Sequence, residues 1–210
     1  MLLLATRSAG KLRELRALCA SRGILDVVDL AGAGVEEQPA EDALEVHPTF
    51  EANALAKARY FHGRAGGTGR SGGAGRATVA DDSGLCVAAL GGRPGVLSKR
   101  WSGRRDLAGQ ALDDENNRLL MAALQGKSDR RAHYVCAAAY VDGVRELVCR
   151  GEVHGHITEV ARGAGGFGYD PYFAADELAG RTFGEASGEE KESVSHRGRA
   201  FARLLAALGS

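Results

Sequence analysis

The chain has 210 residues, of which 44% are hydrophobic and 26% are charged, a composition typical of a soluble globular protein and too apolar for global disorder. Its 27 Lys and Arg residues balance its 27 Asp and Glu residues, which argues against a dedicated nucleic-acid-binding protein because such proteins are usually basic. The length predicts one domain over residues 1–210.

Cysteine usage and hydrophobicity indicate the compartment. No two of the four cysteines are spaced as a C-x-x-C metal or redox motif, so we expect reduced thiols in a cytoplasmic protein. No apolar run approaches the roughly 20 residues that cross a bilayer. We therefore expect no membrane insertion.

The chain opens with a strand, a helix and a second strand. Leu2–Thr6 is short and apolar, leucines recur at helical spacing from Lys11, and Ile24–Leu30 is again apolar. This order predicts an α/β fold with partly parallel strand pairing.

Two prominent segments follow. The alanine-rich stretch Thr49–Phe61 predicts a helix with Thr49 as its N-cap. Residues 63–76 are rich in glycine and arginine. We expect a mobile surface loop there and assign it no function.

The second half alternates strands and helices. Ala77–Ala80 and Leu85–Val87 predict two strands around a turn at Asp81–Gly84. Leu107–Leu124 predicts a helix, and the Asp142-Gly143 pair predicts a hairpin. A capping box at Ser187 predicts a short helix that carries Lys191, and a last helix starts near His196.

A hydroxyl-rich and basic segment stands at the first strand-to-helix junction. A helix start offers free backbone N–H groups and the positive end of the helix dipole, so added cations suit it to a polyphosphate. A solvated helix start is the alternative. The segment contains Thr6, Arg7, Ser8, Ala9, Gly10 and Lys11.

Two adjacent carboxylates, Asp81 and Asp82, follow a predicted strand. Burying both is costly unless one binds a metal or acts as a base. Neighbouring strand residues face opposite sides, so we expect one carboxylate to enter a site and the other to brace the turn. An ordinary Asp-rich turn is the alternative. A triad of Ser83, His196 and Asp82 is disfavoured because no G-x-S-x-G elbow is present.

Two later segments carry a recognisable chemistry. In Gly165–Pro171, glycines allow close approach to a ligand, Phe167 offers a stacking face, and Asp170 accepts hydrogen bonds. Lys191, His196 and Arg197 place an imidazole among cations near a helix start. The alternatives are a structural turn with Phe167 in the core and a charged helix end.

Taken together, these segments resemble the inosine triphosphate pyrophosphatase family, which acts on non-standard purine nucleoside triphosphates. The matching motifs span nearly the whole chain, in the family's order: LLLATRSAGKLREL, TFEANALAKA, VADDSGL, LGGRPGVLSKRWSG, GGFGYDP, EEK and SHRGRA. The resemblance implies an elongated mixed sheet with flanking helices, two lobes around a central cleft, and a homodimer. It also implies Mg²⁺-dependent hydrolysis of ITP, dITP or XTP to the monophosphate and pyrophosphate.

The resemblance also implies site residues. By the resemblance we expect Asp82 to be the catalytic acid/base residue and a magnesium ligand, and residues 6–11 to hold the phosphates. Glu45 is the second magnesium ligand by spacing, with Glu41 and Glu51 as alternatives. The remaining substrate contacts implied are Ser83, Phe167, Gly168, Tyr169, Asp170, Lys191, His196 and Arg197.

Two other functions stay open from the sequence. One is a related pyrophosphatase for modified pyrimidine nucleotides. The other is a nucleotide- or RNA-binding module without catalysis, which the neutral net charge disfavours.

Overall fold

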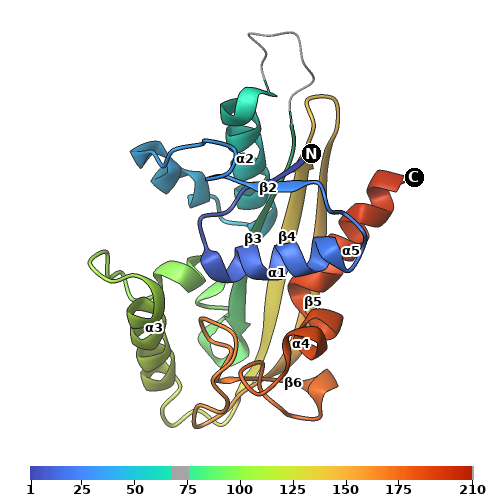
Figure 1. Ribbon diagram of the computed structural model, residues 1–210. Helices are drawn as coiled ribbons and strands as arrows, with labels where there is room; N and C mark the ends of the chain where they lie inside the picture. The colour runs from blue at the N-terminus through green and yellow to red at the C-terminus, as the bar shows by residue number, and fades with distance from the viewer. Residues whose placement is uncertain (68–75, 210) are drawn as a thin grey trace. The chain divides into compact units, whose positions relative to one another are not determined.

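A computed structural model describes residues 1–67 and 76–209 (Figure 1). Six strands form one sheet in the order β2-β1-β3-β4-β5-β6. β1 pairs in parallel with β2 and β3, whereas β5 and β6 are antiparallel. The predicted α/β fold with a mixed sheet and flanking helices is therefore confirmed.

The strands are β1 (Leu2–Leu4), β2 (Val27–Asp29), β3 (Ala77–Val87), β4 (Arg131–Val141), β5 (Glu146–Ile157) and β6 (Phe173–Ala175). The α-helices are α1 (Ala9–Ala20), α2 (Phe50–His62), α3 (Gly109–Ala123), α4 (Gly188–Val194) and α5 (His196–Gly209). Shorter helical turns are Pro39–Glu45, Gly63–Gly67, Ala88–Leu90, Gly95–Arg100 and Asp176–Leu178. Among residues 1–67 and 76–209, no helix has the length and apolar character needed to cross a membrane.

The chain divides into two compact units. Unit 1 comprises residues 1–82, 136–151 and 197–210, and unit 2 comprises residues 83–135 and 152–196. The chain passes from one unit to the other at Asp82–Ser83, Val135–Cys136, Gly151–Glu152 and His196–Arg197.

Unit 1 has a core of mostly aliphatic side chains, with Phe201 among them, from α1, α5 and the strands β1, β3 and β4. Leu15 and Leu18 of α1 and Phe201 and Leu204 of α5 are at most 2% exposed. These residues recur at three- and four-residue spacing, so each helix buries one face. This packing fixes the start of α1 and of α5, where predicted site residues lie.

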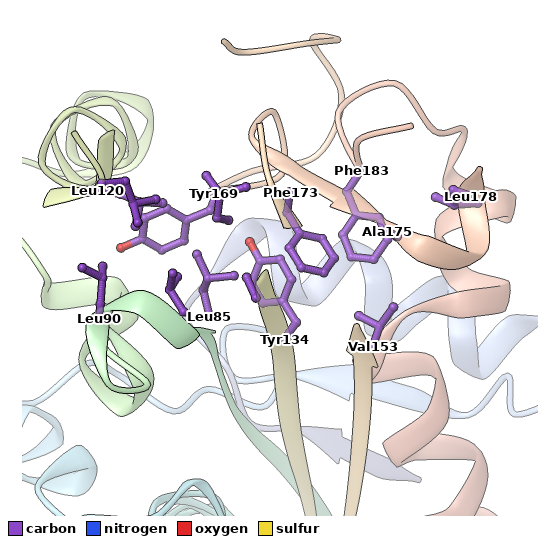
Figure 2. Close-up of a cluster of buried hydrophobic side chains, with 14 residues drawn as sticks. Leu85, Leu90, Leu120, Tyr134, Val153, Tyr169, Phe173, Ala175, Leu178 and Phe183 are labelled. Carbon is purple, nitrogen blue, oxygen red and sulfur yellow. The ribbon is translucent and has the colours of Figure 1, made fainter. Parts of the chain in front are cut away.

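Unit 2 has a core centred on aromatic rings (Figure 2). The Tyr134 and Phe173 ring centroids are 4.8 Å apart with an edge-on interplanar angle of 68°, an arrangement that aromatic pairs favour. The ring centroids of Phe183 and Phe173 are 5.2 Å apart. The Tyr134 ring also stacks on the His196 imidazole at 4.7 Å, so the core holds the imidazole in place.

The predicted helix starts are confirmed where a capping residue signals them. The Thr49 hydroxyl accepts a hydrogen bond from Ala52 N, and Ser187 and Glu190 form the predicted capping box. The last helix begins at His196 as expected. Local hydrogen bonds decide these boundaries, which is why the sequence predicts them.

The predicted turn at Asp81–Gly84 is wrong, because β3 runs unbroken from Ala77 to Val87. Both carboxylates have polar partners within the fold, so neither has to reach solvent through a turn. At the start of the predicted 63–76 loop, Gly63–Gly67 form one helical turn. The strand after this loop begins at Ala77, as predicted. Residues 68–75 of that predicted loop lie outside the described residues.

Candidate functional site

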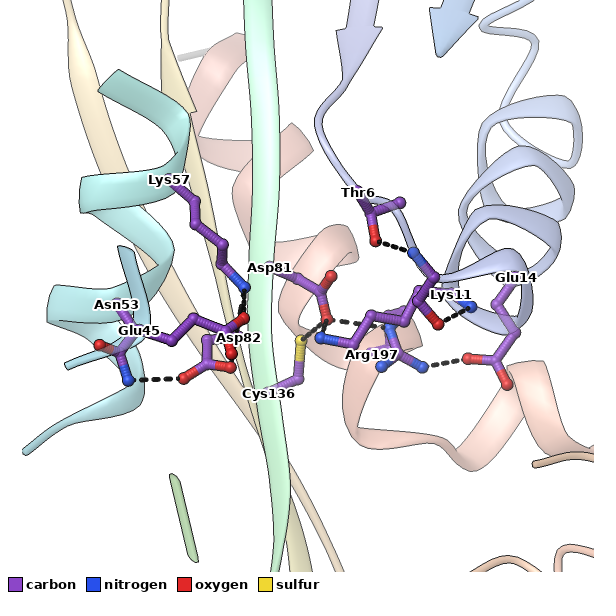
Figure 3. Close-up of polar contacts among 11 residues, drawn as sticks. Thr6, Lys11, Glu14, Glu45, Asn53, Lys57, Asp81, Asp82, Cys136 and Arg197 are labelled. Atoms are coloured by element: carbon purple, nitrogen blue, oxygen red, sulfur yellow. Dashed lines mark hydrogen bonds and ion pairs between the residues drawn. The ribbon is translucent and has the colours of Figure 1, made fainter. Parts of the chain in front are cut away.

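In unit 1, Asp81 and Asp82 point to opposite sides of β3 (Figure 3). Asp81 lies on the side of α1 and α5, and Asp82 lies on the side of α2. This alternation follows from the period of two in a β-strand. The prediction that the two side chains face opposite sides of the strand is confirmed, whereas the predicted bracing of a turn is wrong because β3 is unbroken.

Asp82 is 4% exposed and contacts polar side chains of α2. Asn53 Nδ2 donates a hydrogen bond to Asp82 Oδ2 at 2.9 Å, and Lys57 Nζ lies 3.7 Å from Asp82 Oδ1. Lys57 Nζ also contacts Glu45 Oε1 at 2.7 Å. Lys57 therefore joins the two carboxylates that the family resemblance assigns to magnesium.

The electrostatics of this group favour a basic carboxylate. Burial is the main cause that raises the pKa of Asp82, and the negative charge of Glu45 adds to it, while Lys57 and Lys11 partly oppose the rise. Burial lowers the pKa of Lys57, but Glu45 and Asp82 outweigh it, so that pKa is raised and the ammonium stays charged. An ionised carboxylate with a raised pKa is a better proton acceptor than an exposed one.

The three candidates for the second carboxylate have different partners in the structure. Glu41 forms a two-pronged ion pair with Arg7, at 3.0 and 2.8 Å. Glu51 pairs with Arg150 at 2.8 Å and its side chain is 36% exposed. Glu45 contacts Lys57, which also lies beside Asp82, and the charge of Glu45 contributes to the raised pKa of Asp82.

On the other side of β3, Asp81 pairs with two cations. Its Oδ2 lies 3.2 Å from Lys11 Nζ and 3.2 Å from Arg197 Nε. Arg197 is 2% exposed and also pairs with Glu14. Burial would raise the pKa of Asp81, but Lys11 and Arg197 outweigh it and hold that pKa well below its usual range.

The other residues of the predicted phosphate segment shape the start of α1. Thr6 Oγ1 accepts a hydrogen bond from Ser8 N, and Ser8 Oγ accepts one from Lys11 N. Arg7 is turned toward Glu41 and the carbonyl of Val35. These contacts set the local backbone and hold Lys11 toward Asp81.

Unit 2 contains the second predicted cluster. Lys191 Nζ donates to Asp170 Oδ2 at 2.6 Å and lies 5.0 Å from the centre of the Phe167 ring. Asp170 Oδ2 also accepts from Phe167 N at 2.8 Å. Gly166 has φ +77°, and a Cβ there would collide with the Asp170 carboxylate, so this turn requires glycine.

The two aromatic residues of this loop have different surroundings. Phe167 is half-buried, so its placement in the core, the alternative raised above, is not seen. Tyr169 is 4% exposed, and its hydroxyl donates to the Ser98 carbonyl at 2.8 Å. Burial raises the pKa of Tyr169. The ring of Tyr169 is thus a core element that anchors the loop.

Two side chains of helix α3 hydrogen-bond the backbone of this loop. The sequence motifs did not reveal this role of α3. Asp113 Oδ2 accepts a hydrogen bond from Gly168 N at 2.8 Å, and Asn117 Nδ2 donates to Gly168 O at 2.9 Å. The spacing of four puts both side chains on one helix face. The polar residues between Leu112 and Leu120, which are both buried, were the sequence signal that could have indicated this role.

Asn53 and Lys57 were also missed. They too are four residues apart, on the α2 face that buries Ala54 and Ala58. An amide and a lysine on an otherwise apolar helix face signal buried polar partners elsewhere in the fold.

Comparison with known proteins identifies the family of the chain. The model of the Ham1 family matches residues 2–207. The chain belongs to the Ham1 family. This confirms the family resemblance inferred from the motifs.

Full-length relatives support the same assignment. A Ham1-family relative from Mycolicibacterium paratuberculosis, named dITP/XTP pyrophosphatase, is 46% identical over 99% of this chain and 95% of that protein. The solved structure of a HAM1 protein from Coxiella burnetii matches with a TM-score of 0.76 and 32% identity, over 99% of this chain and 98% of that chain. A structure from Mycobacterium abscessus, described as a nucleoside-triphosphatase / dITP/XTP pyrophosphatase, matches with a TM-score of 0.68 and 41% identity, over 99% and 98% of the two chains.

Proposed function

We propose that this protein hydrolyses non-standard purine nucleoside triphosphates, such as ITP, dITP and XTP, to the monophosphate and pyrophosphate. It thereby removes these compounds from the nucleotide pool. The observation that carries the proposal is the buried Asp82, which lies beside Lys57 and Glu45 and has a raised pKa. The names of the full-length relatives support the substrate class.

Magnesium is the cofactor that suits this group. Within residues 1–67 and 76–209, no cluster of three or more His, Cys, Asp or Glu side chains is arranged to hold a metal ion. Glu45 and Asp82 still fit Mg²⁺, because this ion is usually bound by one or two carboxylates together with waters and substrate phosphates. When bound, Mg²⁺ neutralises phosphate charge and polarises the bond that breaks.

Asp82 acts on the attacking water. Its carboxylate orients a water molecule toward the α-phosphorus and accepts the proton that the water loses. The water oxygen bonds to the α-phosphorus, the bond to the β-phosphate oxygen breaks, and pyrophosphate leaves. The cations Lys57 and Lys11, whose charges both act on Asp82, hold the phosphates together with the helix start at residues 6–11.

The loop around Phe167 recognises the base. The half-buried Phe167 ring stacks on the purine, and the peptides from Gly168 to Asp170 complete that wall. Lys191 offers a donor to the oxygen at the six-position, which inosine and xanthosine have and adenine lacks. A site built to hydrogen-bond a substrate group rejects an analogue that lacks this group by about 10⁴–10⁵-fold. Ser83, His196 and Arg197 are proposed as the remaining substrate contacts.

One assay tests the proposal: pyrophosphate release from a panel of nucleoside triphosphates, including modified pyrimidines, with and without Mg²⁺. We expect fast release from ITP, dITP or XTP, slow release from ATP and GTP, and none without divalent cation. Equal rates on all purines would remove the selectivity. A preference for modified pyrimidines, or salt-sensitive RNA binding without hydrolysis, would favour the other functions.

A homodimer in the cytoplasm is part of the proposal. Light scattering on the purified protein measures the mass of the assembly and would show a monomer if the dimer is wrong.

A further inference from the structure

Asn53, the one amide side chain of α2, has no role in the proposed chemistry so far. Its side chain is 0% exposed. Asn53 Oδ1 accepts a hydrogen bond from His47 N at 2.9 Å, and Asn53 Nδ2 donates to His47 O at 3.3 Å. The carboxamide thus pairs with both the backbone N–H and the backbone C=O of His47.

This pairing determines which way the amide faces. Since Oδ1 must face the His47 N–H, Nδ2 is the atom that faces Asp82, and it donates to Asp82 Oδ2 at 2.9 Å. Nδ2 has two hydrogens, one for His47 O and one for Asp82. The amide therefore has a single orientation in which all its groups are satisfied.

The contact with His47 matters because Glu45 lies two residues earlier. Asn53 ties the segment that carries Glu45 to the strand that carries Asp82. Lys57, one helical turn further along α2, ties the same two segments by its contacts with Glu45 and Asp82 (Figure 3). Asn53 connects the two segments through hydrogen bonds of defined direction. The Lys57 ammonium group, in contrast, is a point charge that can rotate.

We propose that Asn53 is a positioning residue, which sets the spacing and the rotation of the Glu45 and Asp82 carboxylates for the magnesium-dependent step. The inference rests on the proposed function. By occupying Asp82 Oδ2, the amide leaves Oδ1 as the oxygen that faces Lys57. Removal of such an outer partner of a metal ligand typically costs about 10–100-fold in metal affinity or activity.

The chain offers a matched control in Asn116 of α3. Asn116 is 2% exposed, accepts a hydrogen bond from Ser102 N at 2.8 Å and donates to Lys99 O at 3.1 Å. It clamps a backbone segment as Asn53 does, but at a position in unit 2 with backbone partners. The variants Asn53→Ala and Asn116→Ala therefore lose similar structural contacts.

The test measures kcat and KM for ITP, Mn²⁺ binding to the substrate-free protein by electron paramagnetic resonance, and thermal unfolding. We expect both variants to lose thermal stability. We expect Asn53→Ala alone to lower kcat by about 10–100-fold and to weaken Mn²⁺ binding by a similar factor. Equal effects of the two variants on kcat, or wild-type kcat and Mn²⁺ affinity in Asn53→Ala, would overturn the inference.

A second variant covers the case in which Asn53→Ala does not fold. In Asn53→Asp, one oxygen still accepts from His47 N, but the other faces the Asp82 carboxylate and repels it. We expect kcat to fall at least as far as stated above, and a wild-type kcat would again contradict the positioning role. If the unaltered protein releases no pyrophosphate, the proposed function fails, while Mn²⁺ binding still reports on Asn53.

Discussion

Asp81 and Asp82 are consecutive residues of β3, yet their carboxylates have opposite electrostatic environments. Asp81 Oδ2 lies 3.2 Å from both Lys11 Nζ and Arg197 Nε, and its pKa is lowered. Asp82 is buried beside Glu45 and Lys57, and its pKa is raised. One carboxylate is thus suited to holding cations in place, and the other to accepting a proton.

The first prediction concerns Asp82→Asn. We expect turnover of ITP to fall by about 10²-fold or more, because the proton acceptor is lost. Stability should not fall, since a raised pKa means that folding penalises the ionised carboxylate, and the neutral amide removes that penalty. Pyrophosphate release and thermal unfolding of the same sample measure both effects. Wild-type turnover would end the catalytic assignment.

The second prediction concerns Asp81→Asn. We expect a loss of about 3–5 kcal/mol in the free energy of unfolding, because the buried Arg197 and the Lys11 ammonium lose a shared counter-charge. Glu146→Gln is the control, since Glu146 pairs with Arg59 on the surface, where the side chains are 42% and 57% exposed. That variant should lose less than about 1 kcal/mol in urea unfolding. Similar losses of unfolding free energy in the two variants would contradict the role of Asp81 as the buried counter-charge of Lys11 and Arg197.

The same carboxylate predicts a pH dependence with a defined sign. The folded-state pKa of Asp81 lies below its unfolded value of about 3.9. The stability that ionised Asp81 contributes is therefore complete above that pH and is lost as the pH falls toward the folded-state pKa. The stability difference between wild type and Asp81→Asn should be largest near neutral pH and shrink below about pH 4.

The third prediction separates the candidate metal ligands. Glu45→Gln should raise the Mg²⁺ concentration needed for half-maximal activity by about 10-fold or more, because a carboxylate ligand is lost. Glu51→Gln is the matched control, because Glu51 pairs with Arg150. An unchanged Mg²⁺ requirement in Glu45→Gln would show that another group provides the second carboxylate.

The fourth prediction compares the two phenyl rings beside Lys191. Lys191 Nζ lies 5.0 Å from the Phe167 ring centre and 5.3 Å from that of Phe183. Phe183 is 1% exposed in the core of unit 2, so Phe183→Ala should cost about 3–5 kcal/mol of stability. Phe167 is half-buried, so Phe167→Ala should mainly raise KM for ITP. An unchanged KM in Phe167→Ala would argue against stacking on the base.

The sequence by itself determined the family and those helix starts that a capping residue marks. Thr49 and Ser187 predicted helix starts, because capping depends on residues three positions apart. Ordered motifs across the chain identified the family, and the spacing of Asp81 and Asp82 predicted that they face opposite sides of the strand.

Only the tertiary structure decided which side chains are the polar partners of Asp81 and Asp82. It showed an unbroken strand where a turn was predicted, since Lys11, Arg197, Asn53 and Lys57 surround the two carboxylates from distant parts of the chain. It also placed Lys57 in contact with both Glu45 and Asp82, and it paired the Asn53 amide with the Asp82 carboxylate. Such long-range pairing of charges and amides is set by how helices pack on the sheet, and local sequence patterns do not encode it.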